Sequence, residues 1–62
     1  MKRIHFNVAD FPNFIDALVG YTWSATFVAH GFKTHQFDYS GGRYGYHSLS
    51  EEEYTWFVLR WS

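Results

Sequence analysis

The chain contains no cysteine, so it cannot be a small secreted scaffold held together by disulfides. With 62 residues it lies near the size at which a hydrophobic core becomes marginal, and we expect one domain spanning residues 1–62. Stability must therefore come from burying large side chains. Three Trp, five Tyr and seven Phe meet that need, because each aromatic side chain buries roughly 150–250 Å².

Charge of either sign is also scarce. Six acidic and five basic residues give a formal net charge of -1, and the basic residues are scattered along the chain at Lys2, Arg3, Lys33, Arg43 and Arg60. Proteins that bind DNA or RNA usually concentrate Lys and Arg on one face, and a DNA-mimicking surface needs a large excess of acid. The composition therefore disfavours both classes.

Long apolar runs are missing as well. The longest, Trp56 to Leu59, is far shorter than the roughly 20 residues that cross a bilayer. After Met1 and two basic residues the sequence alternates between apolar and polar residues, which leaves no run of signal-peptide length. We expect a complete small protein in the cytoplasm that does not associate with membranes.

Alternation of apolar and polar residues indicates three strands. We expect them over Lys2–Val8, Thr22–Val28 and Phe32–Tyr39. The second and third would form a β-hairpin over Tyr21–Tyr39, with Gly31 as the left-handed residue of a three-residue turn. This register gathers the aromatic residues of both strands on one face and pairs Trp23 with Phe37.

A helical spacing of apolar residues predicts a helix over Phe11–Val19. Asp10 is a favourable N-cap, Pro12 suits the first turn, and Gly20 is placed to end the helix. A helix this short is not stable alone in water, so we expect its apolar stripe to pack on the sheet.

A second helix is predicted over Glu51–Trp61. Ser50 followed by three glutamates has the pattern of a capping box, and an apolar stripe follows at Tyr54, Phe57, Val58 and Trp61. Residues 54–61 are also rich in strand-forming types, so a strand is the alternative there. A strand would be apolar on both faces and would need covering on both, which favours the helix.

These elements predict a two-layer α+β fold. A three-stranded sheet with a central hairpin would be covered on one face by two short helices, in the order strand, helix, strand, strand, helix. The Gly-rich segment Ser40–Tyr46 interrupts the pattern and is expected to be a mobile loop.

The sequence offers little that indicates catalysis or a cofactor. The histidines, His5, His30, His35 and His47, lack a zinc-binding spacing, so we expect no metal and ordinary pH-sensitive side chains. The Gly-rich loop resembles a phosphate-binding loop only in its glycines, because the Lys-Ser/Thr pair is missing. No nucleophile stands in a context that places it beside a base. We expect no cofactor and no enzymatic activity.

The number of aromatic residues is the more informative feature. Eight are assigned to the core: Phe6, Phe11, Phe14, Trp23, Phe27, Phe37, Phe57 and Trp61. The others are left for the rim or the outside: Tyr21, Phe32, Tyr39, Tyr44, Tyr46, Tyr54 and Trp56. Because Tyr, Trp and Arg anchor protein interfaces, we predict a binding surface made by Arg43, Tyr44, Tyr46 and Trp56.

The resulting hypothesis is a non-enzymatic module that binds a protein partner and occludes its surface, with a homodimer as a further form of association. Its size and composition are typical of the small inhibitors with which phages and mobile elements block host enzymes or defence complexes. The alternative is a protein that binds single-stranded nucleic acid through Arg and aromatic residues of the Gly-rich loop.

Overall fold

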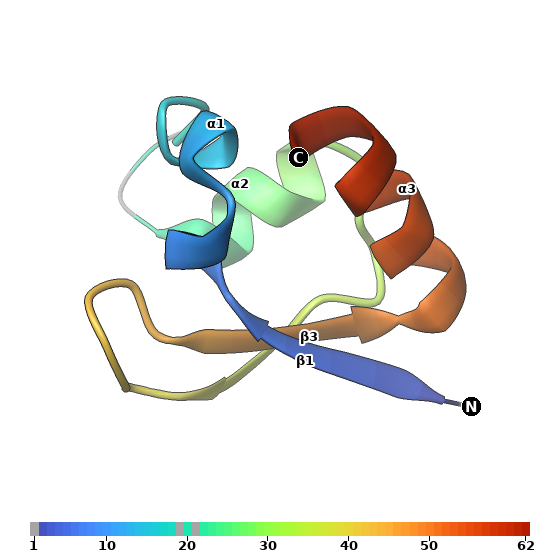
Figure 1. The fold of residues 1–62 in the computed structure, drawn as a ribbon, viewed down its shortest axis with the longest axis horizontal. Helices are drawn as coiled ribbons and strands as arrows, with labels where there is room; N and C mark the ends of the chain where they lie inside the picture. The colour runs from blue at the N-terminus through green and yellow to red at the C-terminus, as the bar shows by residue number, and fades with distance from the viewer. Residues whose placement is uncertain (1, 19, 21) are drawn as a thin grey trace.

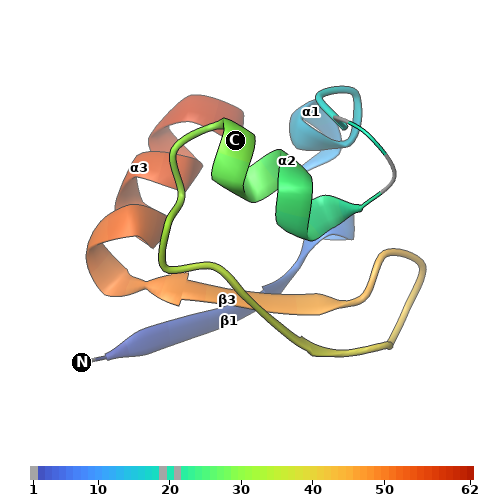
Figure 2. The ribbon, with the colours of Figure 1, turned by 180° about the vertical axis from the view of Figure 1, so that it is seen from behind.

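The three strands form one antiparallel sheet in the order β1-β3-β2. The structure is a computed structural model that describes residues 2–18, 20 and 22–62. Its elements are β1 (Arg3–Asn7), the 3-10 turn η1 (Val8–Asp10), α1 (Pro12–Ile15), α2 (Trp23–Ala29), β2 (Gln36–Tyr39), β3 (Tyr46–Ser50) and α3 (Glu51–Trp61). The helices lie on one face of the sheet and leave the other face uncovered (Figures 1 and 2). The predicted two-layer α+β class is confirmed.

The first strand forms where the alternation predicts it. Phe6 is buried under the helices, and Ile4 is half-buried on the same face. The strand ends at Asn7 because the Asn7 side chain accepts a hydrogen bond from the backbone N–H of Ala9 at 2.8 Å and starts η1. Asp10 was expected to be the N-cap of the next helix, and that prediction is wrong, since Asp10 lies inside η1.

The helix predicted over Phe11–Val19 is much shorter. Pro12 occupies its first turn as expected, and Phe14 is fully buried, but α1 ends at Ile15. The next turn tightens, because the N–H of Ala17 bonds to the carbonyl of Phe14 three residues back. Leu18, an apolar residue inside the predicted helix, is 47% exposed, and the predicted helix end at Val19 falls outside the described residues.

The predicted hairpin over Tyr21–Tyr39 is wrong, because its first strand is the helix α2. The side chain of Thr22 caps this helix by accepting a hydrogen bond from the N–H of Ala25 at 3.1 Å. Trp23 and Phe27 lie four residues apart and face the core, so an alternating sequence also satisfies a helical period. The predicted position of Tyr21 in the hairpin lies outside the described residues.

Gly31 has the positive φ expected of it, but it ends a helix instead of turning a hairpin. Its φ is 91°, its N–H bonds to the carbonyl of Val28 at 3.0 Å, and the N–H of Phe32 bonds to the carbonyl of Phe27 at 2.9 Å. This pair of bonds is the Schellman motif, which usually brings the residue after the glycine into contact with the last helical turn. Phe32 accordingly packs on Phe27, with ring centroids 6.1 Å apart.

The central strand, β3, was not predicted. Tyr46 was placed in the Gly-rich loop and the residues after it were left unassigned, yet Tyr46–Ser50 pairs with β1 on one side and β2 on the other. The strand has only one large aliphatic side chain, Leu49, so its sequence gives a weak signal of burial. The hairpin of the fold is therefore β2 and β3, joined by residues 40–45.

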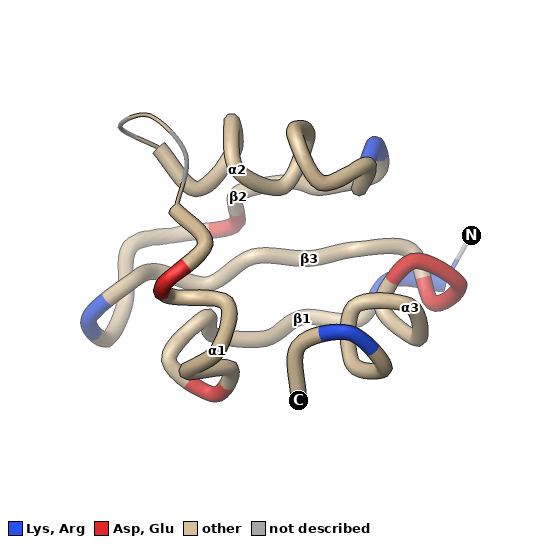
Figure 3. Tube along the Cα trace, turned by 90° about the horizontal axis from the view of Figure 1, so that it is seen from above, with Lys and Arg blue, Asp and Glu red and all other residues tan. Residues whose placement is uncertain are grey.

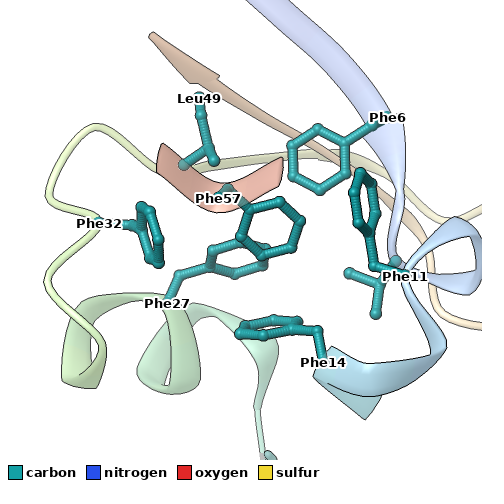
Figure 4. Packing of buried hydrophobic residues seen from close by; sticks show 8 residues of the cluster. Phe6, Phe11, Phe14, Phe27, Phe32, Leu49 and Phe57 are labelled. Atoms are coloured by element: carbon teal, nitrogen blue, oxygen red, sulfur yellow. The ribbon is translucent and has the colours of Figure 1, made fainter. Parts of the chain in front are cut away.

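Helix α3 forms over the predicted range, Glu51–Trp61, and the alternative of a strand there is excluded. The core beneath it is mostly phenylalanine, and Figure 4 shows rings from α1, α2, α3 and β1 meeting around Phe57. Its buried apolar residues are Phe6, Val8, Phe11, Phe14, Phe27, Phe32, Leu49 and Phe57. Two assignments were reversed: Phe32, expected at the rim, is 5% exposed, and Phe37, expected in the core, is 52% exposed.

Candidate binding surface

The four predicted binding residues lie on two separate parts of the molecule. Arg43 and Tyr44 belong to the loop between β2 and β3, and Tyr46 is the first residue of β3. Trp56 lies on α3, which begins at the opposite end of β3 from this loop (Figure 1). The structure therefore brings three of the four residues together and separates Trp56 from them.

Tyr44 is partly a structural residue. Its half-buried ring packs edge-on against Trp23 at 5.8 Å and contacts the core. The guanidinium of Arg43 lies over the same ring, 5.5 Å from its centroid, and the carbonyl of Tyr44 is 3.1 Å from His47 Nε2. Arg43 is exposed and held near the hairpin by this cation–π contact.

Tyr46 stacks on Tyr39 across the hairpin, with ring centroids 4.9 Å apart and planes at 20°. The register shifts between Phe37 and Tyr39, as at a β-bulge, so Asp38 and Tyr39 both reach the uncovered face of the sheet. Tyr39 is 59% exposed. Sequence reasoning placed Tyr39 at the rim but outside the binding site. The predicted hairpin paired the strand of Tyr39 with residues 22–28 and not with β3, so the contact with Tyr46 was missed.

Phe37 belongs to the same strand as Tyr39 but points to the helix-covered side. It pairs with His47, and its ring meets the His47 ring at 5.5 Å, but half of it stays exposed because β2 is an edge strand. The edge strand therefore exposes an aromatic ring on each side of the sheet, Phe37 on the helix-covered side and Tyr39, stacked on Tyr46, on the uncovered face. We call Phe37, Tyr39 and Tyr46 the aromatic edge. Of the three residues of the aromatic edge, Tyr46 was predicted to belong to the binding site, and Phe37 and Tyr39 were not.

A polar network crosses the uncovered face of the sheet. Ser48 Oγ accepts hydrogen bonds from Arg3 Nε and Nη2 at 3.1 and 3.0 Å and donates to Asp38 Oδ1 at 3.4 Å. Asp38 Oδ2 is 2.6 Å from Nδ1 of His5, and Arg3 Nη2 also donates to the carbonyl of Thr34 at 2.6 Å. The network ties the three strands together and occupies the guanidinium of Arg3. Sequence reasoning missed this network, because it did not predict β3.

Trp56 borders a separate open hollow of about 430 Å³ at the start of α3. Its walls are Lys2, Thr34, Ser50, Glu51, Glu52, Glu53 and Trp56. Lys2 forms an exposed ion pair with Glu51 at 3.3 Å, and Trp56 is 52% exposed. A surface ion pair of this kind contributes little to stability.

His35 and His47 form a pair on the helix-covered side of the hairpin. His35 Nε2 lies 2.8 Å from His47 Nδ1, and His47 is 1% exposed, so it is not the ordinary partly exposed histidine that we expected. Burial lowers the pKa of both rings, that of His35 to about 4. Among the described residues, no three or more His, Asp or Glu side chains are grouped as a metal site would need.

None of the helices in the described ranges has the length and hydropathy that crossing a membrane demands. Comparisons with protein-family models, with curated proteins and with solved structures find no match for this chain. Any functional conclusion therefore depends on the arrangement of its own residues.

Proposed function

We propose that this protein is a non-enzymatic binding module that acts in the cytoplasm by covering a surface of a protein partner. The observation that carries the proposal is the aromatic edge. Phe37 and Tyr39 are 52% and 59% exposed in a chain that depends on aromatic burial for its stability. Covering the exposed part of each ring would contribute on the order of 1 kcal/mol, and aromatic residues are typical anchors of protein interfaces.

The aromatic edge is also held in place before any partner arrives. Tyr39 stacks on Tyr46, and a Cβ added to Gly41 would lie 3.1 Å from the Tyr46 ring and 3.2 Å from the Tyr39 ring. The loop behind the rings is tied by two bonds to the carbonyl of Gly41, from the N–H of Gly45 at 3.0 Å and from Asn7 Nδ2 at 3.2 Å. Side chains ordered in advance lose less entropy on binding, which favours affinity.

The finer proposal is an inhibitor of the kind used by phages and mobile elements. Two features support it, the small size of the chain and the position of its exposed rings. The chain has room for one small domain, and its exposed rings lie on a strand edge that a larger protein could cover. Such an inhibitor needs contact area and no catalytic group. The proposed contacts are Phe37, Tyr39 and Tyr46, together with Arg43 and Tyr44 of the loop that joins β2 and β3.

The test compares two variants with a tagged wild-type chain. The double variant Phe37→Ser, Tyr39→Ser removes two rings of the aromatic edge, and Leu59→Ser removes the 79% exposed side chain of α3. We expect a protein captured by the wild type to be lost with the double variant and retained with Leu59→Ser, while both variants keep a folded circular dichroism spectrum. Equal capture by all three would exclude the aromatic edge as the binding surface.

Single-stranded nucleic acid is the second candidate ligand. It is favoured by one observation, the stacked Tyr39 and Tyr46 on an uncovered sheet face, since aromatic rings on a sheet can stack with bases. Against it, Figure 3 shows the basic positions on separated parts of the described trace, and Arg3 is bonded within the sheet. Binding of labelled oligonucleotides that weakens steeply with salt would support this candidate; no shift at low salt would exclude it.

A further inference from the structure

The hydrogen bonds of the pair His35 and His47 have a defined direction. The carbonyl of Tyr44 can only accept, so His47 Nε2, 3.1 Å away, carries a hydrogen. In the neutral ring His47 Nδ1 is then an acceptor, and the hydrogen of the 2.8 Å bond belongs to His35 Nε2. The neutral pair therefore donates in one direction, from His35 to His47 and from His47 to Tyr44.

Apolar rings surround this pair, but His47 is buried in the core whereas His35 is partly exposed. The His35 ring stacks on Phe27 of α2, with centroids 4.3 Å apart and planes at 10°. The His47 ring is enclosed by Phe6, Phe27 and Phe37 and is anchored in the central strand. His35 is partly exposed and immediately precedes β2. Of the two rings, His35 is the one that can leave without opening the core.

Counting protons shows what acid does to the pair. One added proton can be accepted on His35 Nδ1, and the bond from His35 Nε2 to His47 Nδ1 then remains. A second proton must go to His47 Nδ1, which would make both facing nitrogens donors at a separation of 2.8 Å. The closed pair therefore accepts at most one added proton, whereas two separated histidines accept two.

We propose that the pair of His35 and His47 is an acid-sensitive contact that keeps β2 on the sheet: binding of the second proton separates the two rings, His35 moves into solvent, and β2 opens while β1 and β3 stay paired. The opening is confined to β2 because the residue before His35 is fixed independently. Thr34 is bonded to Glu53 and to Ser50 of α3 and β3, and its carbonyl accepts from Arg3.

Some of the groups around the pair raise the pKa of its rings and others lower it. Arg3, from β1, opposes the charge on His35, as does a charged His47, while Asp38, from β2, favours a proton on either ring. The carbonyl of Tyr44, from the loop, also favours charge on His47, and α2 contributes only the apolar ring of Phe27. Burial exceeds these contributions and lowers the pKa of both rings, to about 4 for His35. The inference concerns the fold and is independent of the proposed function.

The experiment is amide hydrogen exchange followed by NMR between pH 7 and pH 4, corrected for the intrinsic pH dependence of exchange. We expect the protection of amides in β2 to fall at least tenfold more than that of amides in β1. In His35→Gln the glutamine amide can still donate to His47 but takes up no proton, so the additional loss should disappear. His30→Gln, at an exposed histidine outside the pair, is the matched control and should behave as the wild type.

Two results would overturn the proposal: equal loss of protection in β1 and β2 of the wild type, or an unchanged acid response in a folded His35→Gln protein. If His35→Gln does not fold, imidazole NMR of the wild type decides. The proposal requires the rings of His35 and His47 to take up protons in two separate steps, the later one accompanied by changes in β2. Simultaneous titration of both rings near 6.5, as in free histidines, would contradict it.

Discussion

Thr34 and Glu53 are joined by two hydrogen bonds that insert Thr34 into the N-terminal cap of α3. The backbone N–H and the hydroxyl of Thr34 both donate to Glu53 Oε1, at 3.0 and 2.8 Å. The hydroxyl oxygen accepts from the N–H of Ser50 at 3.0 Å, and Ser50 Oγ accepts from the N–H of Glu53 at 3.2 Å. In an ordinary capping box the glutamate side chain would bond to the N–H of Ser50 itself. Here Thr34 links the segment before β2 to the start of α3.

Replacing this hydroxyl should destabilise the whole fold. Thr34→Val keeps the shape of the side chain but leaves the N–H of Ser50 without its acceptor, and we expect a loss of roughly 1–3 kcal/mol in the free energy of unfolding. Thr55→Val is the control, since the Thr55 hydroxyl donates to a helical carbonyl at an exposed position. Urea unfolding of both variants checks this, and equal losses would show that the inserted hydroxyl has no special role.

The glycine before β3 should be harder to replace than the glycine after α2. Gly45 and Gly31 both have positive φ, 81° and 91°, so alanine at either costs about 1 kcal/mol in backbone conformation. A Cβ at Gly45 would also lie 3.0 Å from the ring of Phe37, whereas nothing lies within 4 Å of a Cβ at Gly31. We expect Gly45→Ala to be the more destabilising by roughly 0.5–1 kcal/mol in thermal unfolding. Equal losses would mean that the Phe37 ring moves aside at no cost.

Local signals located two elements but did not predict how the strands pair. Ser50 and the three glutamates located α3, and the alternation around Phe6 located β1. Gly31 correctly indicated a positive φ, but a left-handed glycine ends a helix as readily as it turns a hairpin. The choice between the two depends on Phe27 and Phe32 meeting in the core, which is a tertiary contact.

The candidate site was predictable only where it followed from composition. Exposed aromatic residues were expected because so small a chain cannot bury all its rings, and Arg43, Tyr44 and Tyr46 all belong to the β2–β3 hairpin. Tyr39 and Phe37 could not be assigned, because their exposure depends on β2 being an edge strand beside the unpredicted β3. The sequence alone also gave no reason to place His47 inside the core.

Acid should destabilise the protein through His35 and His47. Both pKa values are lowered on folding, so both rings are neutral in both states above pH 6.5 and their contribution to stability is then fully present. Below 6.5 the unfolded chain takes up protons that the folded pair resists, and stability falls until pH approaches the His35 value of about 4. Because His35 is partly exposed, we expect a total loss on the order of 2 kcal/mol.

Urea unfolding at intervals between pH 7.5 and pH 4 measures this dependence. The midpoint should fall below pH 6.5 in the wild type and in His30→Gln, and much less in His35→Gln. A midpoint that stays constant to pH 4.5 in the wild type would contradict the lowered pKa values. The difference between His35→Gln and His30→Gln isolates the part of the change that belongs to the pair.

Two tyrosines at the hairpin, Tyr44 and Tyr39, should separate stability from binding. Tyr44 packs on Trp23 and the core, so Tyr44→Ala should cost roughly 2 kcal/mol or more. Tyr39 is 59% exposed and loses mainly its stacking on Tyr46, so Tyr39→Ala should cost only about 0.5–1.5 kcal/mol. Thermal unfolding of the two variants decides the order. If Tyr39→Ala proved the more destabilising, the aromatic edge would be a structural support, and the reason for expecting a partner there would be lost.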